Sequence, residues 1–175
     1  GLGNYITDHF VKKKYKVFII GRKVSKDLLN KIIFYKVDIF NNIKFSEILN
    51  NLKTKEFQII IHNIGGSLGI KNINSSVKDY YKLWFYNLGN SIQINNLFLN
   101  KMKKRKWGRI LHVSSATSYN ITGGGPYSSA KSALNSYVKC VANEYGKHNV
   151  IISSICPGPI NLQNRFLAKQ QKKKN

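Results

Sequence analysis

The chain has 175 residues, and its 29 lysines and arginines against seven aspartates and glutamates give a net charge of +22. This length suits one domain, residues 1–175, with its own core, and a content of 42% hydrophobic residues excludes a disordered chain. Two scattered cysteines, Cys140 and Cys156, exclude a disulfide framework and favour a reducing, cytoplasmic setting. No apolar run approaches the roughly 20 residues that cross a membrane, so we expect no membrane partner.

Lysines cluster in residues 11–16, 101–106 and 169–175, and this charge has two interpretations. It could attract nucleic acid or an anionic cofactor, or it could be a lysine-rich composition spread over solvated helix faces. We favour the second, because basic and aromatic residues do not alternate as a base-stacking surface requires. No specific nucleic-acid partner is expected.

Short apolar segments alternate with amphipathic ones along the chain. Each apolar segment ends at Gly, Pro, Asn, Asp or Ser, which predicts buried strands at residues 16–21, 32–38, 57–63, 108–115 and 150–158. Apolar spacing predicts helices at residues 4–14, 43–54, 77–102 and 127–147, with Trp84, Leu88, Ile92 and Leu99 on one face of the third. The alternation predicts an α/β fold with a parallel sheet.

The chain opens with "GLG" directly before a predicted helix. Glycines at Gly1 and Gly3, on either side of Leu2, would let the backbone approach a pyrophosphate at the helix N-terminus. Two glycines in this spacing are a weak signal, and taken alone they are better explained as an ordinary strand-to-helix turn.

Tyr127 and Lys131 are four residues apart, which puts them on one face of the predicted helix. A free tyrosine has a pKa of about 10, and a nearby ammonium would lower that pKa toward the range useful for acid–base chemistry. Pro126 fits the first helical turn, where its missing N–H costs nothing. The pair by itself also occurs by chance in many proteins.

Seven short motifs decide between these alternatives: "GLG" (1–3), "VD" (37–38), "HNIGG" (62–66), "WFYNLG" (84–89), "GRILHVSS" (108–115), "PYSSAKSAL" (126–134) and "CPGPI" (156–160). In this order and spacing, over nearly the whole chain, they resemble the motifs of the short-chain dehydrogenase/reductase family. The resemblance implies a Rossmann-like, doubly wound parallel sheet in a three-layer α/β/α arrangement. It also implies hydride transfer between a nicotinamide cofactor and a carbonyl or alcohol substrate.

The resemblance implies four catalytic residues. Tyr127 would protonate the carbonyl oxygen in reduction and deprotonate the alcohol in oxidation, while Lys131 would lower the pKa of Tyr127 and hold the nicotinamide ribose. Ser115 would stabilise the developing alkoxide, with Ser114 as the alternative. Asn87 would sustain a water-linked proton relay through Lys131.

The implied cofactor is NADP rather than NAD. A family member that prefers NAD places an acid near Gly21, whereas this chain has no acid in residues 19–25 and offers Arg22 to clamp a 2′-phosphate. The resemblance implies no metal, and it assigns cofactor binding to Gly1, Leu2, Gly3, Arg22, Asp38, Asn63, Gly65, Lys131, Pro157, Gly158 and Ile160.

The sequence also departs from the family pattern. His62 and Ile64 replace the first asparagine and the alanine of N-N-A-G, and we expect them to reshape the floor of the adenine side. Asn161 stands near the usual threonine contact to the carboxamide. Family members run to about 250 residues. We therefore expect a fragment with an incomplete sheet, lacking the first strand and the substrate loop.

Three interpretations follow from the whole sequence. The leading one is an oxidoreductase that forms a homodimer or homotetramer when complete, since the helices matching residues 77–102 and 127–147 pair across a two-fold axis in the family. The second is a non-catalytic nucleotide-binding relative or an inactive fragment. The third, a basic nucleic-acid-binding domain, is disfavoured because the charges are dispersed.

Overall fold

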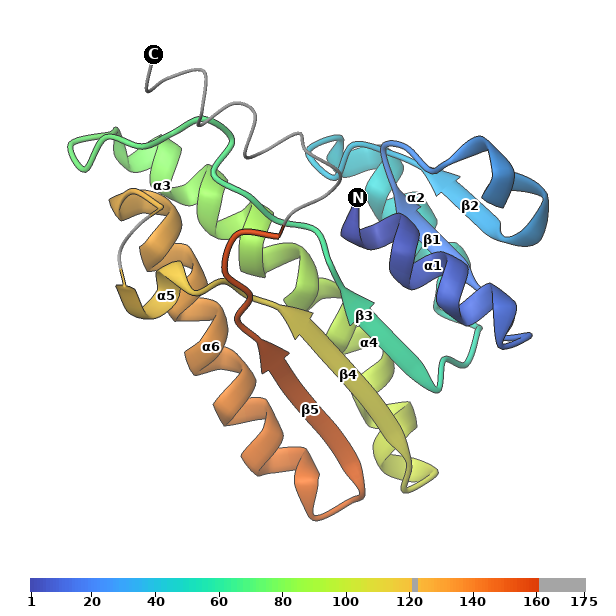
Figure 1. Cartoon of the computed structure of the whole chain (residues 1–175). Coiled ribbons are helices and arrows are strands. Elements are labelled where there is room, and N and C mark those ends of the chain that lie inside the picture. The colour runs from blue at the N-terminus through green and yellow to red at the C-terminus, as the bar shows by residue number, and fades with distance from the viewer. Residues whose placement is uncertain (121–122, 161–175) are drawn as a thin grey trace. The chain divides into compact units, whose positions relative to one another are not determined.

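The structure is a computed structural model that describes residues 1–120 and 123–160 (Figure 1). Asn161 and the lysine cluster at 169–175 lie outside these residues. The chain divides into two compact units. Unit 1 is Gly1–Asn41 together with the segment that starts at Gly158, and unit 2 is Asn42–Pro157. Within the described ranges, no helix combines the length and apolarity that crossing a bilayer requires.

Unit 1 contains a two-stranded parallel sheet. Helix α1 (Leu2–Lys12) begins directly after Gly1, and strand β1 (Phe18–Gly21) pairs with β2 (Ile33–Lys36) in the register that sets Phe18 beside Ile33. A 3₁₀ helix, η1 (Lys26–Lys31), connects the two strands. The sequence predicted both strands and α1, although it contained no sign of η1.

Unit 2 contains a three-stranded parallel sheet in the order β3-β4-β5, formed by β3 (Ile59–His62), β4 (Gly108–Val113) and β5 (Val150–Ile155). Its helical segments are α2 (Asn42–Leu52), α3 (Val77–Trp84), η2 (Phe85–Gly89), α4 (Asn90–Lys104), α5 (Thr117–Asn120) and α6 (Gly125–Gly146). The predicted α/β alternation with parallel strands is confirmed, and the strands of the described residues form two separate sheets rather than one.

Helices α4 and α6 contribute to one core with strands β4 and β5. Its buried members are Leu88, Leu99, Met102, Ile110, Leu134, Val138, Val150 and Ile152. Trp84, which the sequence placed on this face, is 43% exposed, whereas Leu83 is fully buried. This exchange of Trp84 for Leu83 is explained by η2, which is a π-helix. In a π turn, residues five apart in the sequence lie on the same face, so Leu83 and not Trp84 is aligned with Leu88.

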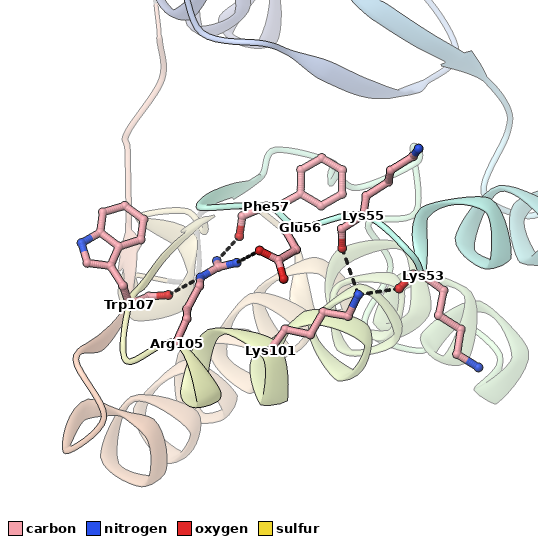
Figure 2. A network of polar contacts seen from close by, with 7 residues as sticks. All are labelled: Lys53, Lys55, Glu56, Phe57, Lys101, Arg105 and Trp107. Atoms are coloured by element: carbon pink, nitrogen blue, oxygen red, sulfur yellow. Dashed lines mark hydrogen bonds and ion pairs between the residues drawn. The ribbon is translucent and has the colours of Figure 1, made fainter.

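Side chains at the C-terminal end of α4 form hydrogen bonds with the segment that leads into β3 (Figure 2). Lys101 Nζ donates hydrogen bonds to the carbonyls of Lys53 and Lys55 at 2.6 and 3.0 Å. Arg105 donates to the carbonyls of Phe57 and Trp107. These two cations of the 101–106 cluster therefore stabilise the fold.

A polar layer interrupts the core of unit 2. His62 and His112 are register partners on β3 and β4, and their rings stack with centroids 4.4 Å apart. Asn95 of α4 places Oδ1 2.8 Å from His62 Nε2 and donates through Nδ2 to the Tyr137 hydroxyl of α6 at 3.0 Å. Four elements thus meet at one amide. Burial lowers the pKa of His62 to about 4, and it lowers the pKa of His112 still further.

Acid should destabilise the chain through these two histidines. Because both folded-state pKa values lie below the ordinary 6.5, the folded chain binds fewer protons than the unfolded chain. The contribution of the neutral imidazoles to the free energy of unfolding is fully present above pH 6.5. It is lost as the pH falls toward 4. Two such groups give a slope of up to about 2.7 kcal/mol per pH unit.

Urea unfolding between pH 7.5 and 4.5 measures this slope. His62→Asn should remove about half of it, since one of the two buried imidazoles is gone. His9→Asn, at an exposed position on α1, is the matched control and should keep the full slope. The same slope in His62→Asn as in the unchanged chain would contradict the assignment.

Candidate active site

The predicted tyrosine–lysine pair lies in the first turns of α6. The helix begins at Gly125, with Pro126 in its first turn. Gly124 precedes it with φ +85°, and a Cβ there would lie 2.9 Å from the carbonyl oxygen of Lys71. Only glycine permits this turn without strain. Tyr127 and Lys131 then follow one helical turn apart, as the sequence predicted.

Lys131 is a buried amine at the end of β4. Its side chain is 2% exposed, and Nζ donates a hydrogen bond to the Val113 carbonyl at 2.8 Å. The amine also lies 5.9 Å from the centroid of the Tyr127 ring. Burial lowers the pKa of Lys131 to about 8, against a smaller opposing effect of Cys156. This amine can exchange a proton close to neutral pH.

Tyr127 is half-buried, and Ser115 is its hydrogen-bonding neighbour. Burial raises the pKa of Tyr127, and the hydrogen bond with Ser115 acts in the opposite direction. The net direction is therefore upward, opposite to the lowering that the sequence predicted for this tyrosine. Ser114 is buried and its hydroxyl lies 3.5 Å from the Lys131 carbonyl, so Ser115 is the serine of the pair that faces Tyr127.

Asn87 lies at the centre of the π-helix η2. Its Oδ1 accepts from the Gly66 N–H at 2.9 Å, while Nδ2 donates to the carbonyls of Gly66 and Leu83 at 3.0 and 2.9 Å. Asn90 donates to two further carbonyls of the π turn. Asn87 thus ties η2 to the loop after β3. π-Helices are often found at functional sites. The hydrophobic pattern of the sequence did not predict this one.

Gly65, in the loop after β3, leaves room for the side chains of Asn87 and Lys131. A Cβ at this position would lie 2.8 Å from both Asn87 Oδ1 and Lys131 Nζ. Lys131 and Asn87 therefore converge at the backbone of Gly65, while Asn63 beside it is exposed. The Pro157 carbonyl, after β5, accepts from the Ala116 N–H at 2.9 Å. The predicted residues of unit 2 thus follow the carboxyl ends of its strands, where α/β sheets bind ligands.

Unit 1 carries the remaining predicted cofactor residues. Gly1, Leu2 and Gly3 form the start of the 11-residue helix α1, whose N-terminus favours an anion. At the end of β1, a side chain at Gly21 would meet no atom within 4 Å, and Arg22 beside it is exposed. After β2, Asp38 Oδ1 accepts from the Phe40 N–H at 3.1 Å, and Gly158 and Ile160 are exposed.

Sequence reasoning missed the groups that hold Lys131 in place. Val113 contributes a backbone carbonyl, which any residue type could supply, so no side-chain signal existed. The contact of Gly124 with Lys71 joins segments far apart in the chain. In the part of the chain that the structure describes, no three His, Cys, Asp or Glu side chains gather as metal ligands.

The comparisons with known proteins agree with this geometry. The family described as "short chain dehydrogenase" matches residues 1–174. A 3-oxoacyl-[acyl-carrier-protein] reductase of Aquifex aeolicus is 24% identical over 171 residues, which cover 90% of this chain and 69% of the relative. A 7alpha-hydroxysteroid dehydrogenase of Paraclostridium sordellii is 26% identical over 149 residues, covering 81% of this chain and 55% of the relative.

Solved structures show the same fold. An oxidoreductase of the short chain dehydrogenase/reductase family from Burkholderia thailandensis aligns with a TM-score of 0.81 at 20% identity, covering 99% of this chain and 70% of that one. ElxO with NADP bound aligns with a TM-score of 0.79 at 25% identity, covering 99% and 75%. The Rossmann-like α/β fold expected from the sequence is thereby confirmed.

A methyl group at Gly65 should disturb this site. In Gly65→Ala the new Cβ must displace Asn87 or Lys131, because it would lie 2.8 Å from both polar atoms. We expect a loss of about 1–3 kcal/mol in the free energy of unfolding, measured in urea. Gly146→Ala is the matched control, since nothing lies within 4 Å of its Cβ. Equal stability of the two variants would show that Gly65 is not tightly enclosed.

Proposed function

Since this chain belongs to the short-chain dehydrogenase family, whose members use NAD(P), we propose that its full-length protein transfers hydride between NADP(H) and a carbonyl or alcohol substrate. The observation that carries the proposal is the meeting of Ser115, Tyr127 and Lys131 at the carboxyl end of β4. The chain spans 69% and 55% of its two relatives described above, so the activity is proposed for the longer protein.

Tyr127 is the proposed acid–base group. Because burial raises its pKa, the phenol is protonated at neutral pH and can donate its proton to a substrate carbonyl oxygen. This favours the reduction direction near pH 7. Oxidation of an alcohol requires the phenolate, so the oxidation rate should increase as the pH rises.

Ser115 and Lys131 complete the proposed proton chemistry. The Ser115 hydroxyl would donate a hydrogen bond to the oxygen that becomes an alkoxide, which stabilises the charge that develops there. Lys131, with a pKa of about 8, would bind the ribose hydroxyls and return a proton to Tyr127 after each turnover. The relay through Asn87 stays a prediction, and its amide is held by the backbone of Gly66 and Leu83.

The residues present fit a dinucleotide. When bound, NADP(H) supplies or accepts the hydride. In unit 2, we assign Lys131 and Gly65, which lies against its amine, to the ribose, and Asn63 and Pro157 to the same end of the cofactor. In unit 1, we assign Gly1, Leu2 and Gly3 to the pyrophosphate, Asp38 to the adenine, and Gly158 and Ile160 to further contacts with the cofactor.

Arg22 is the proposed determinant of NADP over NAD. The open space at Gly21 leaves room beside an exposed guanidinium, which can hold a 2′-phosphate with two parallel hydrogen bonds. The NADP bound to ElxO, which shares the fold of this chain, is in keeping with this choice. We further propose a cytoplasmic homodimer or homotetramer. The two named relatives differ in substrate, so we assign only the carbonyl or alcohol class.

Tyr127→Phe should slow reduction strongly and leave cofactor binding almost unchanged. In the full-length protein we expect kcat to fall by about 10²-fold or more, because the proton donor is removed, while the NADPH dissociation constant measured by fluorescence changes little. Tyr81→Phe, at an exposed position on α3, is the matched control. NADPH binding without any turnover in the unchanged protein would favour the non-catalytic alternative.

Arg22→Ala should weaken NADPH binding by about 10-fold to 100-fold, because a charged hydrogen-bonding partner of the 2′-phosphate is lost. NADH binding should not change, and adding Gly21→Asp should reverse the preference. Calorimetry of the full-length protein with both cofactors measures each step. Lys13→Ala, on the same unit, is the control. Equal affinity of the unchanged protein for NADPH and NADH would refute the role of Arg22.

A further inference from the structure

The polar layer of His62, Asn95, His112 and Tyr137 adjoins the buried Lys131. Val113, whose carbonyl accepts from Lys131 Nζ at 2.8 Å, directly follows His112 on β4. Tyr137 lies on α6, the helix that carries Lys131. The charge of Lys131 is also close enough to His112 to lower the pKa of the imidazole. The layer and the amine therefore share one strand and one helix.

Asn95 dictates where the protons of both imidazoles lie. Its Oδ1 can only accept, so the nitrogen 2.8 Å away, His62 Nε2, carries a hydrogen. Its Nδ2 can only donate, so His112 Nε2 at 3.4 Å offers a lone pair, and the His112 proton is on Nδ1. That Nδ1 is buried without a hydrogen-bonding partner within the described residues. With the Asn95 amide in this orientation, the two stacked rings are opposite tautomers.

We propose that Asn95 is a positioning residue for Lys131, which sets His62 and His112 in opposite tautomers and so holds β4 and α6 where the Val113 carbonyl meets the lysine amine. The inference rests on the proposed catalytic role of Lys131. It gives the four residues of the polar layer, which contact neither substrate nor cofactor in the proposed mechanism, a role in positioning Lys131. This role requires neutral imidazoles, because each neutral ring offers Asn95 one specific hydrogen-bond donor or acceptor.

A proton added to this layer would find no compensating charge. The groups that face His112 are His62 from β3, the neutral amide of Asn95 from α4, and Lys131 and Tyr137 from α6. Burial, His62 and Lys131 all lower the pKa of His112. Protonated His112 would direct an N–H at the Asn95 NH₂ group and place a second cation near Lys131. Acid should therefore release the amine from its position.

Nitrogen-15 NMR of the imidazoles tests the tautomers without any variant. We expect His62 as the Nε2–H form and His112 as the Nδ1–H form at pH 7, with neither ring taking up a second proton between pH 7 and 5.5. The reverse assignment would mean that the Asn95 amide is turned around, and it would overturn the proposal. So would either ring titrating near pH 6.5 in the folded chain.

Asn95→Asp tests the connection to Lys131. The carboxylate would accept from both rings and from Tyr137, so His112 should gain an Nε2–H, and the nearby negative charge should raise the pKa of Lys131 from about 8 by roughly one unit. The Lys131 Cε carbon shift, followed from pH 6 to 11, reports this titration. Asn96→Asp, on the exposed neighbouring position of α4, is the matched control and should change neither signal.

Tyr137→Phe keeps the test valid if Asn95→Asp does not fold. It removes one hydroxyl from the layer, and we expect the pKa of Lys131 to move toward the ordinary 10.5, while Tyr145→Phe on the same helix leaves it unchanged. A Lys131 titration identical in the unchanged chain and in Tyr137→Phe would refute the positioning role. Both readouts work without substrate, so a failure of the positioning role is measured separately from a loss of activity, which would refute the proposed function.

Discussion

The hydrogen bond between the Lys131 amine and the Val113 carbonyl is the constraint on which the candidate site depends. A lysine that is 2% exposed loses most of its hydration, and burial lowers its pKa to about 8, so the amine needs a fixed acceptor to remain charged. The 2.8 Å contact with Val113 supplies that acceptor. The missing Cβ of Gly65 leaves space beside the amine, and Asn87 ties the adjoining π-helix to Gly66. These features arrange the loop after β3, the π-helix and α6 around one polar atom.

Charge is distributed unevenly between the surface and the interior of unit 2. The polar layer behind Lys131 is neutral, because burial lowers the pKa of both His62 and His112. The abundant lysines lie mainly outside the core, and Lys101 and Arg105 stabilise the fold by binding backbone carbonyls. A net charge of +22 is compatible with this arrangement because a buried cation is costly whereas a solvated lysine is not. Near Lys131 and Tyr127, burial is the largest effect on both pKa values.

Local patterns were sufficient to predict most elements of the fold. The strands at 18–21, 33–36 and 59–62 lie inside the predicted apolar segments, because a short apolar run that ends at a turn residue has few other stable outcomes. The segment 77–102 was predicted as one helix and is helical throughout, but the unpredicted π turn η2 lies between α3 and α4. A π turn is stabilised by contacts from elsewhere, such as those that Asn87 makes with Gly66, and helical periodicity does not encode them.

By itself, the sequence determined the order of strands and helices and the family resemblance. It also determined that Tyr127 and Lys131 lie one turn apart on one helix, because spacing along a helix fixes which side chains share a face. Only the tertiary structure decided that Ser115 rather than Ser114 faces Tyr127, since two neighbouring residues at a strand end differ only in the direction of their side chains. It also decided that the Lys131 amine binds the Val113 carbonyl and that burial raises the pKa of Tyr127. Burial and backbone acceptors depend on residues distant in sequence, and for that reason no local pattern contains them.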